Sequence, residues 1–400
     1  MRISNLPGQI SESKTLAITA LAAQMRTQGR QIISLSAGEP DFETPRVIRE
    51  AGIQAIEKGW TRYTPAAGKP EVRKAVADSL QRDFGLNYKS EEICITAGTK
   101  PAIYESLLVL LNRGDKALIF APYWVSYPDL VKMAAGEPII LKTQEKNGFL
   151  PTKSDLEKVF AEHDLSCVIL NSPSNPTGTV WPPDLLEDLV GLCADHETWI
   201  LSDEIYGQIT YGGTLHVSPA EIRGGRKLTV VLNGLSKAYS MTGWRLGYLA
   251  APKDVTKAVA KIQSQMIGNA CTISQGAALE ALGKDHSKER NEMLEAFSHR
   301  RGYLLERLPN LKGFSLRAPA GAFYMFPGVQ ALLDHQNWDD ERFCMEALQE
   351  IGVALVPGSA FGFPGHIRIS FAASLDDLKE ALHRLETWVT ALWSGSKLAN

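Results

Sequence analysis

The sequence predicts an α/β fold in which helices cover both faces of a mostly parallel sheet, followed by a smaller α+β domain. Two observations predict this fold. From about residue 45 to 290, short apolar runs alternate with helical patterns, as strands and helices do in a parallel sheet. After residue 290 the alternation stops, and a charged helical stretch leads into short strands and further helices. No repeat or low-complexity tract separates the parts, so we expect one compact body.

The predicted elements follow in chain order. An amphipathic helix is expected over 12–30, and a strand over 32–42 that runs into a Gly-Pro turn. Strands of the first part are expected at 93–96, 117–120, 138–141, 167–170, 199–202 and 228–232. Helices of the first part are expected at 100–111, 183–195 and 274–282. Further helices are expected over 288–308, near 340–351 and from 375. The expected division is an arm that also joins the smaller domain (1–44), a large domain (45–290) and a small C-terminal domain (291–400).

Composition limits the classes of function. An apolar fraction of 44% and a net charge of −3 are typical of a globular protein and give no electrostatic footprint for nucleic acid or membrane. The five cysteines are scattered and have no zinc or CxxC spacing, so we expect core residues, no metal site and a reducing compartment. No apolar run approaches the ~18 residues of a membrane span, and the N-terminus has no signal-peptide core. We therefore expect a cytoplasmic protein.

Polar and aromatic residues follow four of the predicted strands. Trp124 follows 117–120, Asn175 follows 167–170, Asp203 and Tyr206 follow 199–202, and Lys237 follows 228–232. Singly, each has an ordinary explanation as a helix cap, a turn residue, a core residue or a solvated lysine. Because the carboxyl ends of parallel strands meet at one edge of a sheet, their coincidence there predicts a functional site.

A second pattern predicts an anion-binding site. AGTK (97–100) follows a strand and opens a helix, which places the amides of Gly98 and Thr99 at the positive end of the helix. Arg245 adds a planar guanidinium suited to a phosphate group. GxGxxG and GxxxxGK[ST] are both absent from the sequence, so a lone phosphate is favoured over a dinucleotide or a triphosphate.

A lone phosphate, a lysine, an acid and an aromatic side chain together predict pyridoxal 5′-phosphate (PLP) as cofactor. Lys237 supplies the primary amine for the cofactor's aldehyde, and Asp203 the carboxylate that pairs with its ring nitrogen. Trp124 offers a face for stacking, while Tyr206 and Asn175 donate hydrogen bonds to the phenolate oxygen. Partial burial near other cations is expected to lower the pKa of Lys237.

On these residues the chain resembles the class I aminotransferases of PLP fold type I along almost its whole length. The matching motifs, in the family's order, are SAGEPDF (36–42), RYTPAAG (62–68), TAGTK (96–100), APYWVSYP (121–128), NSPSNPTG (171–178), SDEIY (202–206), SKAYSMTGWRLGY (236–248), AGAFY (320–324) and HIRIS (366–370). The resemblance implies a large PLP-binding domain and a smaller domain built from both termini.

The resemblance also implies a role for each matching residue. The catalytic residues are Lys237, Asp203 and Tyr206. The other residues implied to bind the cofactor are Asn175, Trp124, Lys100 and the phosphate contacts Gly98, Thr99, Ser236 and Arg245. Tyr63 matches a tyrosine that reaches the phosphate from the neighbouring subunit, which implies a homodimer with shared sites. The residues implied to bind substrate are Arg368, which binds the α-carboxylate, with Gly38, Asn175 and Trp124.

Two departures from the family bear on the site. Gly234 stands where many relatives have a serine that binds the phosphate, so one hydroxyl is expected to be missing. No arginine occurs between Arg245 and Arg290, where other aspartate aminotransferases bind the distal carboxylate.

A different subgroup uses a lysine and nearby hydroxyls for the distal carboxylate instead. Here these residues are Lys100, Ser13 and Thr15. The pairing of Thr15 with Lys100 also marks enzymes that transaminate prephenate. A helix-surface lysine explains Lys100 equally well, although a helix N-terminus disfavours a cation.

The resemblance thus implies a transaminase that moves an amino group between aspartate or glutamate and a 2-oxo acid in ping-pong order, with prephenate as a further substrate. A PLP-dependent carbon–sulfur lyase and an aromatic aminotransferase on the same fold are the alternatives. A regulatory protein with an aminotransferase-like domain is disfavoured, because no DNA-binding module precedes residue 30.

Overall fold

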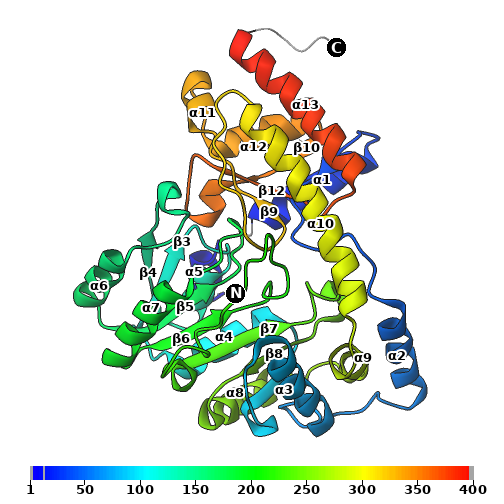
Figure 1. The fold of residues 1–400 in the computed structure, drawn as a ribbon, viewed down its shortest axis with the longest axis vertical. Helices are drawn as coiled ribbons and strands as arrows, with labels where there is room; N and C mark the ends of the chain where they lie inside the picture. The colour runs from blue at the N-terminus through cyan, green and yellow to red at the C-terminus, as the bar shows by residue number, and fades with distance from the viewer. Residues whose placement is uncertain (1–2, 12–13, 396–400) are drawn as a thin grey trace.

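A computed structural model describes residues 3–11 and 14–395 of the chain (Figure 1). Its centre is a seven-stranded sheet in the order β2-β8-β7-β6-β5-β3-β4. Within this sheet β8 runs antiparallel to both neighbours, whereas the pairs from β7 to β4 are all parallel. The strands are β2 (Ile93–Thr96), β3 (Lys116–Ala121), β4 (Glu137–Lys142), β5 (Leu165–Asn171), β6 (Trp199–Asp203), β7 (Thr229–Gly234) and β8 (Gly247–Ala250). The predicted α/β class, with a mostly parallel sheet, is confirmed.

Helices bury both faces of this sheet, and the strands show why. In β5, Cys167 and Ile169 pack in one apolar cluster with α4 and α5, while Val168 and Leu170 pack in another with α6 and α7. Successive side chains of a strand point to opposite faces, so a continuous apolar run buries both. The helices of this part are α2 (Arg46–Glu57), α3 (Pro70–Phe84), α4 (Thr99–Leu110), α5 (Tyr127–Met133), α6 (Lys153–Glu162), α7 (Pro183–Asp195), α8 (Lys253–Met266) and α9 (Thr272–Gly283).

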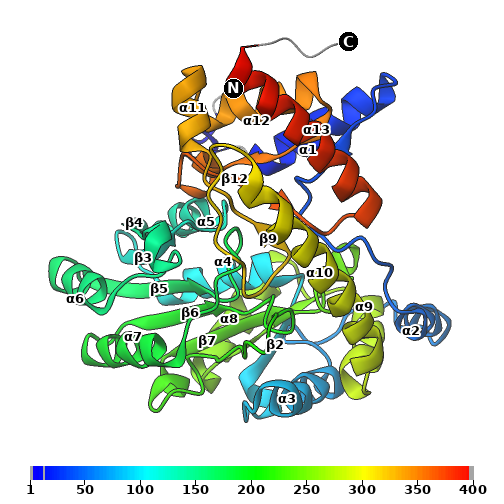
Figure 2. The same cartoon turned by 45° about the horizontal axis from the view of Figure 1, so that its top comes forward.

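The second part of the chain has its own apolar core around a small antiparallel sheet, β11-β12-β9. Its strands are β9 (Tyr324–Met325), β10 (Val353–Ala354), β11 (Val356–Pro357) and β12 (Ile367–Ser370), and its helices are α10 (Ser287–Arg307), α11 (Gln330–Gln336), α12 (Asp340–Glu350) and α13 (Leu375–Ser394). The N-terminal segment joins this part, because β1 (Ile33–Ser34) pairs with β10 and α1 (Lys14–Thr27) contacts it. Figures 1 and 2 show the large sheet below, the second part above, and α10 extending from one to the other.

Most of the elements with predicted bounds end within about two residues of the observed ends, although several helices, among them α2, α3 and α6, had no predicted bounds. Two strands differ from the prediction. The strand β8 was not predicted, because its four residues follow a loop motif directly and carry no turn signal of their own. The strand expected over 32–42 is wrong beyond β1. The amide of Leu35 still bonds Ala354 of β10, but the carbonyl groups of Ser36 and Gly38 then bond side chains of both parts of the molecule, as described below.

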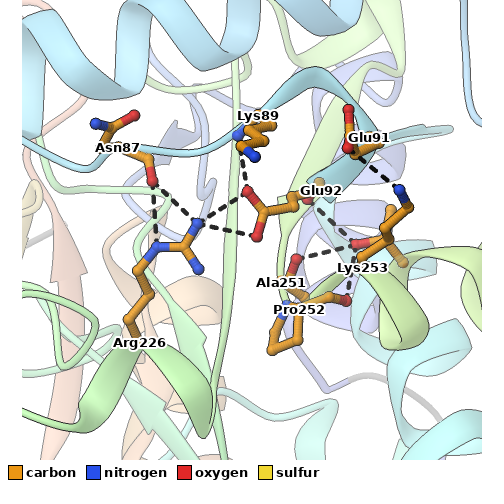
Figure 3. A network of polar contacts seen from close by, with 9 residues as sticks. Asn87, Lys89, Glu91, Glu92, Arg226, Ala251, Pro252 and Lys253 are labelled. Atoms are coloured by element: carbon orange, nitrogen blue, oxygen red, sulfur yellow. Dashed lines mark hydrogen bonds and ion pairs between the residues drawn. The ribbon is translucent and has the colours of Figure 1, made fainter.

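A polar network joins segments at the amino-terminal ends of the parallel strands (Figure 3). This side of the sheet is opposite to the carboxyl ends of β5, β6 and β7. Arg226 lies in the short 3-10 helix before β7 and binds both carboxylate oxygens of Glu92, at 3.0 and 2.9 Å, and the carbonyl oxygen of Asn87. Both contacts to Glu92 are made by the Nη2 atom of Arg226. Glu92 directly precedes β2, so this ion pair joins the starts of β2 and β7. Lys253 adds an exposed ion pair to Glu91. No helix in the described part of the chain has both the length and the apolarity needed to span a bilayer.

Candidate active site

A cavity of about 370 Å³ opens at the carboxyl ends of β3, β5, β6 and β7. It is lined by most of the residues that the sequence singled out: Gly38, Thr99, Lys100, Trp124, Asn175, Asp203, Tyr206, Ser236, Lys237, Arg245 and Arg368. The rule that ligands bind beyond the carboxyl ends of parallel strands therefore located this cavity correctly. Arg368 comes from β12, so both parts of the molecule contribute to it.

Two of the predicted site residues, Gly98 and Tyr63, do not line the cavity, and two others fall outside what the structure describes. Gly98 lies behind the cavity, where a Cβ atom would come within 2.6 Å of the Arg245 guanidinium. Tyr63 is absent from the lining, and 94% of its surface is exposed in the single chain. Ser13 lies outside the described residues. Thr15 belongs to α1, but its side chain also lies outside what the structure describes.

Lys237 follows β7 and is held at the floor of the cavity. Its ammonium donates a 2.6 Å hydrogen bond to the carbonyl oxygen of Gly38. Burial lowers the pKa of Lys237 from 10.5 to about 8; Arg368 and Arg245 act in the same direction, and Glu39 and Asp203 oppose them. A much larger fraction of the side chain is therefore a neutral, nucleophilic amine near neutral pH than for a surface lysine.

Asp203 is the last residue of β6 and is buried. Burial raises its pKa from 3.8 to about 6, and a 2.7 Å hydrogen bond from the Tyr127 hydroxyl favours its charged form. The carboxylate is thus poised to bind a cationic group that brings its own charge into the cavity. Tyr127 was not predicted as a site residue, although it lies in the APYWVSYP motif three residues after Trp124 and one turn further along the chain.

The anion end of the cavity is built by close backbone packing at the start of α4. A Cβ atom on Gly247 would lie 2.6 Å from the amide nitrogen of Thr99, so glycine is required for β8 to approach the helix. A Cβ atom on Gly234 would lie 3.1 Å from the Thr99 hydroxyl oxygen. The sequence analysis expected a serine hydroxyl to be missing at Gly234. The Thr99 hydroxyl lies in the space that this serine side chain would enter. Arg245 lies against the same helix end, and its guanidinium donates to the carbonyl oxygen of Thr242 at 2.8 Å.

Arg368 is a buried guanidinium with no carboxylate partner among the described residues. It donates to Asn175 Oδ1 at 2.9 Å and to the carbonyl oxygen of Ser36 at 2.6 Å, and it lies 4.6 Å from the ring centre of Tyr324. Its Nε atom has no hydrogen-bond partner in the described part of the chain. A buried cation with an unused donor favours an anionic ligand, because a buried charge is costly unless it is paired.

Tyr324 is a second residue that sequence reasoning did not assign to the site. Its hydroxyl lies 2.8 Å from that of Tyr206, and a Cβ atom on Gly38 would lie 3.0 Å from the same hydroxyl.

For Lys100 the sequence left two interpretations open, a substrate-binding residue and a helix-surface lysine. Lys100 lies at the open side of the cavity with its ammonium 4.8 Å from the ring centre of Trp124. Partial burial and the nearby Arg245 lower the pKa of Lys100, so it is not a plain surface lysine.

The donor set fits PLP. Lys237 would supply the amine, Asp203 the buried carboxylate for a ring cation, and the start of α4 with Arg245 an anion site. Trp124 lines the same cavity. A mostly parallel sheet with this constellation at its carboxyl edge defines a PLP-dependent enzyme of fold type I.

Comparisons with known proteins give the family. The family profile described as aminotransferase class I and II matches residues 30–385. The chain is 40% identical to the aspartate aminotransferase of Geobacillus stearothermophilus, over 98% of this chain and all of that protein. It is 41% identical to the aspartate/prephenate aminotransferase of Thermus thermophilus, over 93% of this chain and 94% of the relative. The chain therefore belongs to the class I and II aminotransferases, and it is a PLP-dependent transaminase.

Solved structures agree with this assignment. The aspartate aminotransferase of Thermus thermophilus with maleate superposes with a TM-score of 0.90 at 39% identity, over 96% of this chain and 99% of the other. The aspartate aminotransferase of Rhizobium meliloti superposes with a TM-score of 0.92 at 36% identity, over 98% and 99%. The predicted fold type is confirmed along nearly the whole chain.

Replacing Tyr127 by phenylalanine tests the electrostatic role of the Tyr127–Asp203 contact. Without that hydrogen bond the pKa of Asp203 rises further above 6, by about one pH unit, since a hydrogen bond to a charged group contributes about 1.5 kcal/mol or more. As the pH falls, Asp203 of the variant therefore becomes protonated at a higher pH than Asp203 of the wild type. We expect Tyr127→Phe to weaken PLP binding at about pH 6.5 and to leave it near wild type at about pH 8.5, where Asp203 is ionised in both proteins.

The measurement is the dissociation constant of PLP as a function of pH, after removal and return of the cofactor. Tyr123→Phe is the matched control, because Tyr123 lies in the same segment but its hydroxyl does not bond Asp203. An equal loss at both pH values would show that Tyr127 acts only through packing.

Proposed function

We propose that the enzyme transfers the amino group of a dicarboxylic amino acid, aspartate or glutamate, to a 2-oxo acid. Besides Lys237 and Arg245, which are assigned to the cofactor, Arg368 and Lys100 line the same cavity. Neither has a carboxylate partner among the described residues, and this observation carries the proposal. They offer a place for each carboxylate of such a substrate. The names of the relatives, aspartate aminotransferase and aspartate/prephenate aminotransferase, support the same substrate class.

Each residue has a defined task in this proposal. Bound PLP supplies an electron-withdrawing ring that accepts the electron pair of the broken Cα–H bond. Arg368, fixed by Asn175 and Ser36, orients the α-carboxylate and thereby the Cα–H bond. Lys237 carries the proton, because its pKa of about 8 keeps a usable fraction of neutral amine near neutral pH. Asp203 holds the charge of the ring nitrogen in place.

Prephenate is proposed as a further substrate. Lys100 lies at the open side of the cavity, where a substrate larger than aspartate has room, and relatives with this activity in their names support the idea. The carbon–sulfur lyase alternative needs the α-carboxylate contact of Arg368 but not a second cation. Lys100 therefore favours the transaminase with acidic substrates.

We also propose a homodimer with shared active sites. Apolar side chains stay exposed along one face of α2, with Ile53 at 56% and Ile56 at 52%, and Met266 and Ile267 are exposed as well. Exposed apolar side chains of this kind favour a protein partner, and in this proposal a second copy also covers Tyr63. Tyr63 would then reach the neighbouring subunit's cofactor, as the resemblance implies.

The domain roles and the compartment belong to the same proposal. Residues 1–44 would serve as the arm, 45–290 as the PLP-binding domain and 291–400 as the small domain, which the pairing of β1 with β10 supports. The five cysteines form no disulfide among the described residues, which supports a reducing compartment, the cytosol.

Lys237→Ala tests the transaminase assignment of this cavity. We expect turnover to fall at least about a thousandfold, because both the covalent attachment and the proton carrier are removed. Borohydride reduction followed by peptide mass analysis should attach PLP to Lys237 in the wild type and to no residue of the variant. Lys237→Arg, which keeps the charge but has no primary amine, is the matched control and should fail in the same way. Reductive attachment at another lysine would refute the assignment.

Lys100→Ala tests the proposed distal contact. Loss of a hydrogen bond between charged groups should lower kcat/KM for aspartate by about ten- to a hundredfold, and that for alanine and phenylalanine by less than about threefold. Kinetics with all three donors measure this difference. Lys312→Ala is the matched control, because Lys312 also lies over a tryptophan ring, that of Trp393, far from the cavity. An equal loss with every donor would show that Lys100 does not read the distal carboxylate.

Ile53→Asp with Ile56→Asp tests the proposed dimer face. Two charges on this surface should shift the protein from dimer toward monomer in sedimentation velocity and weaken its retention of PLP, since Tyr63 of the second copy is lost. Leu215→Asp is the control, because Leu215 is equally apolar and 81% exposed but lies outside this patch. A wild-type protein that sediments as a monomer would contradict the proposal.

A further inference from the structure

Residues 35–44, called the strap here, bind two of the cations that line the cavity, Arg368 and Lys237. The carbonyl oxygen of Ser36 accepts from Arg368 at 2.6 Å, and that of Gly38 accepts from Lys237 at 2.6 Å. The strap has no regular secondary structure, since β1 ends at Ser34. Hence the positions of these two carbonyl groups depend on the contacts that anchor the strap elsewhere.

The strap is anchored to the strand that carries Arg368. The amide of Leu35 donates to Ala354 at 2.9 Å, and its carbonyl oxygen accepts from the amide of Ser370, in β12, at 2.8 Å. Ser370 lies two positions after Arg368 in the same strand. A displacement of the strap is therefore transmitted to β12 as well as to the Ser36 carbonyl group.

Arg300, in the middle of α10, holds the strap at Asp41. Its two terminal nitrogens bind the two carboxylate oxygens of Asp41 at 2.7 and 2.8 Å, and Nη1 also lies 3.4 Å from the carbonyl oxygen of Phe371. Phe371 follows β12 directly. The guanidinium thus bridges the strap and the end of β12, and only 10% of its side chain is exposed.

We propose that Arg300 and Asp41 are positioning residues for the reaction, acting on Arg368 and Lys237 through the strap and β12. The inference rests on the proposed function in one respect, the role of Arg368 in binding a substrate carboxylate. The bidentate geometry fixes the direction of the strap as well as its distance from α10, which a single hydrogen bond does not. Misplacing a binding group by about 1 Å is enough to weaken its function by up to about a hundredfold.

The other anchors of the strap do not duplicate this contact. Glu39 accepts from the Thr242 hydroxyl at 2.8 Å, and Thr44 bonds Trp244 at 3.1 Å. Both partners lie in the loop before β8, in the first part of the chain. They hold the strap to the large sheet, whereas Asp41 holds it to α10 in the second part. Without the Asp41 contact, the strap would remain bonded to the second part only through Leu35 and Ser36, at its start, and residues 37–44 would be held by the large sheet alone.

Hydrogen exchange in the cofactor-free protein tests the mechanical part of the proposal without reference to catalysis. Arg300→Gln and, as the milder change, Asp41→Asn should increase the exchange rates of the Leu35 and Ser370 amides by at least about tenfold. Arg307→Gln is the matched control, because Arg307 lies in the same helix and binds Glu386 through two nitrogens, away from the strap. It should leave both amides at the wild-type rate.

The affinity of the PLP-loaded enzyme for succinate, a dicarboxylate that does not react, tests the functional part. We expect its dissociation constant to increase about tenfold in Arg300→Gln and Asp41→Asn, and less in Arg300→Lys, which keeps the charge but not the fork. The control Arg307→Gln should bind succinate like the wild type. Unchanged exchange, or unchanged succinate affinity in both test variants, would overturn the proposal.

Arg368→Gln, measured alongside, separates the two ideas. If it weakens succinate binding while the Arg300 and Asp41 variants do not, only the positioning proposal is wrong. If Arg368→Gln itself leaves succinate affinity unchanged, the role given to Arg368 under the proposed function is wrong, and the positioning proposal falls with it. Hydrogen exchange then still decides whether the pair holds the strap.

Discussion

The active site depends on keeping three ionisable groups out of water without pairing them with one another. Lys237, Asp203 and Arg368 are all withdrawn from solvent, and no ion pair joins any two of them among the described residues. Burial moves the pKa of Lys237 down and that of Asp203 up, so each is held closer to neutrality than in water. This arrangement is costly for the folded protein, and it is relieved by ligands that bring the complementary charges.

Such an arrangement requires a rigid surrounding structure, which the large sheet supplies. Its strands are buried on both faces, so their carboxyl ends have little freedom to rearrange and to let the charges collapse onto one another. Each charged group is hydrogen-bonded to a neutral partner. Lys237 bonds the Gly38 carbonyl group, Asp203 the Tyr127 hydroxyl, and Arg368 the side chain of Asn175. They satisfy hydrogen bonds without cancelling charge.

The sequence predicted the cavity well because its residues follow directly from strand ends. The alternation of apolar runs located the strands, and the edge rule then grouped Asp203 and Lys237, which lie within a few residues of β6 and β7. Tyr324 was not assigned, because it meets Tyr206 only through the packing of the second part on the first, which no local pattern encodes. The strap was mistaken for a strand for a related reason. The short run from Ile32 to Leu35 is mostly apolar and typical of a strand, but beyond it the carbonyl groups of Ser36 and Gly38 bond side chains from distant segments.

The two cations proposed to bind substrate carboxylates differ in burial, and this difference bears on specificity. Arg368 is buried and fixed by Asn175 and Ser36, so it suits the α-carboxylate, which every amino-acid substrate presents in the same place. Lys100 is a flexible side chain at the open side of the cavity, resting on the ring of Trp124. A single flexible ammonium can follow carboxylates at different distances, whereas a fixed guanidinium cannot. A rigid contact for the constant group and a movable one for the variable group would let one site accept both aspartate and a bulkier dicarboxylate such as prephenate.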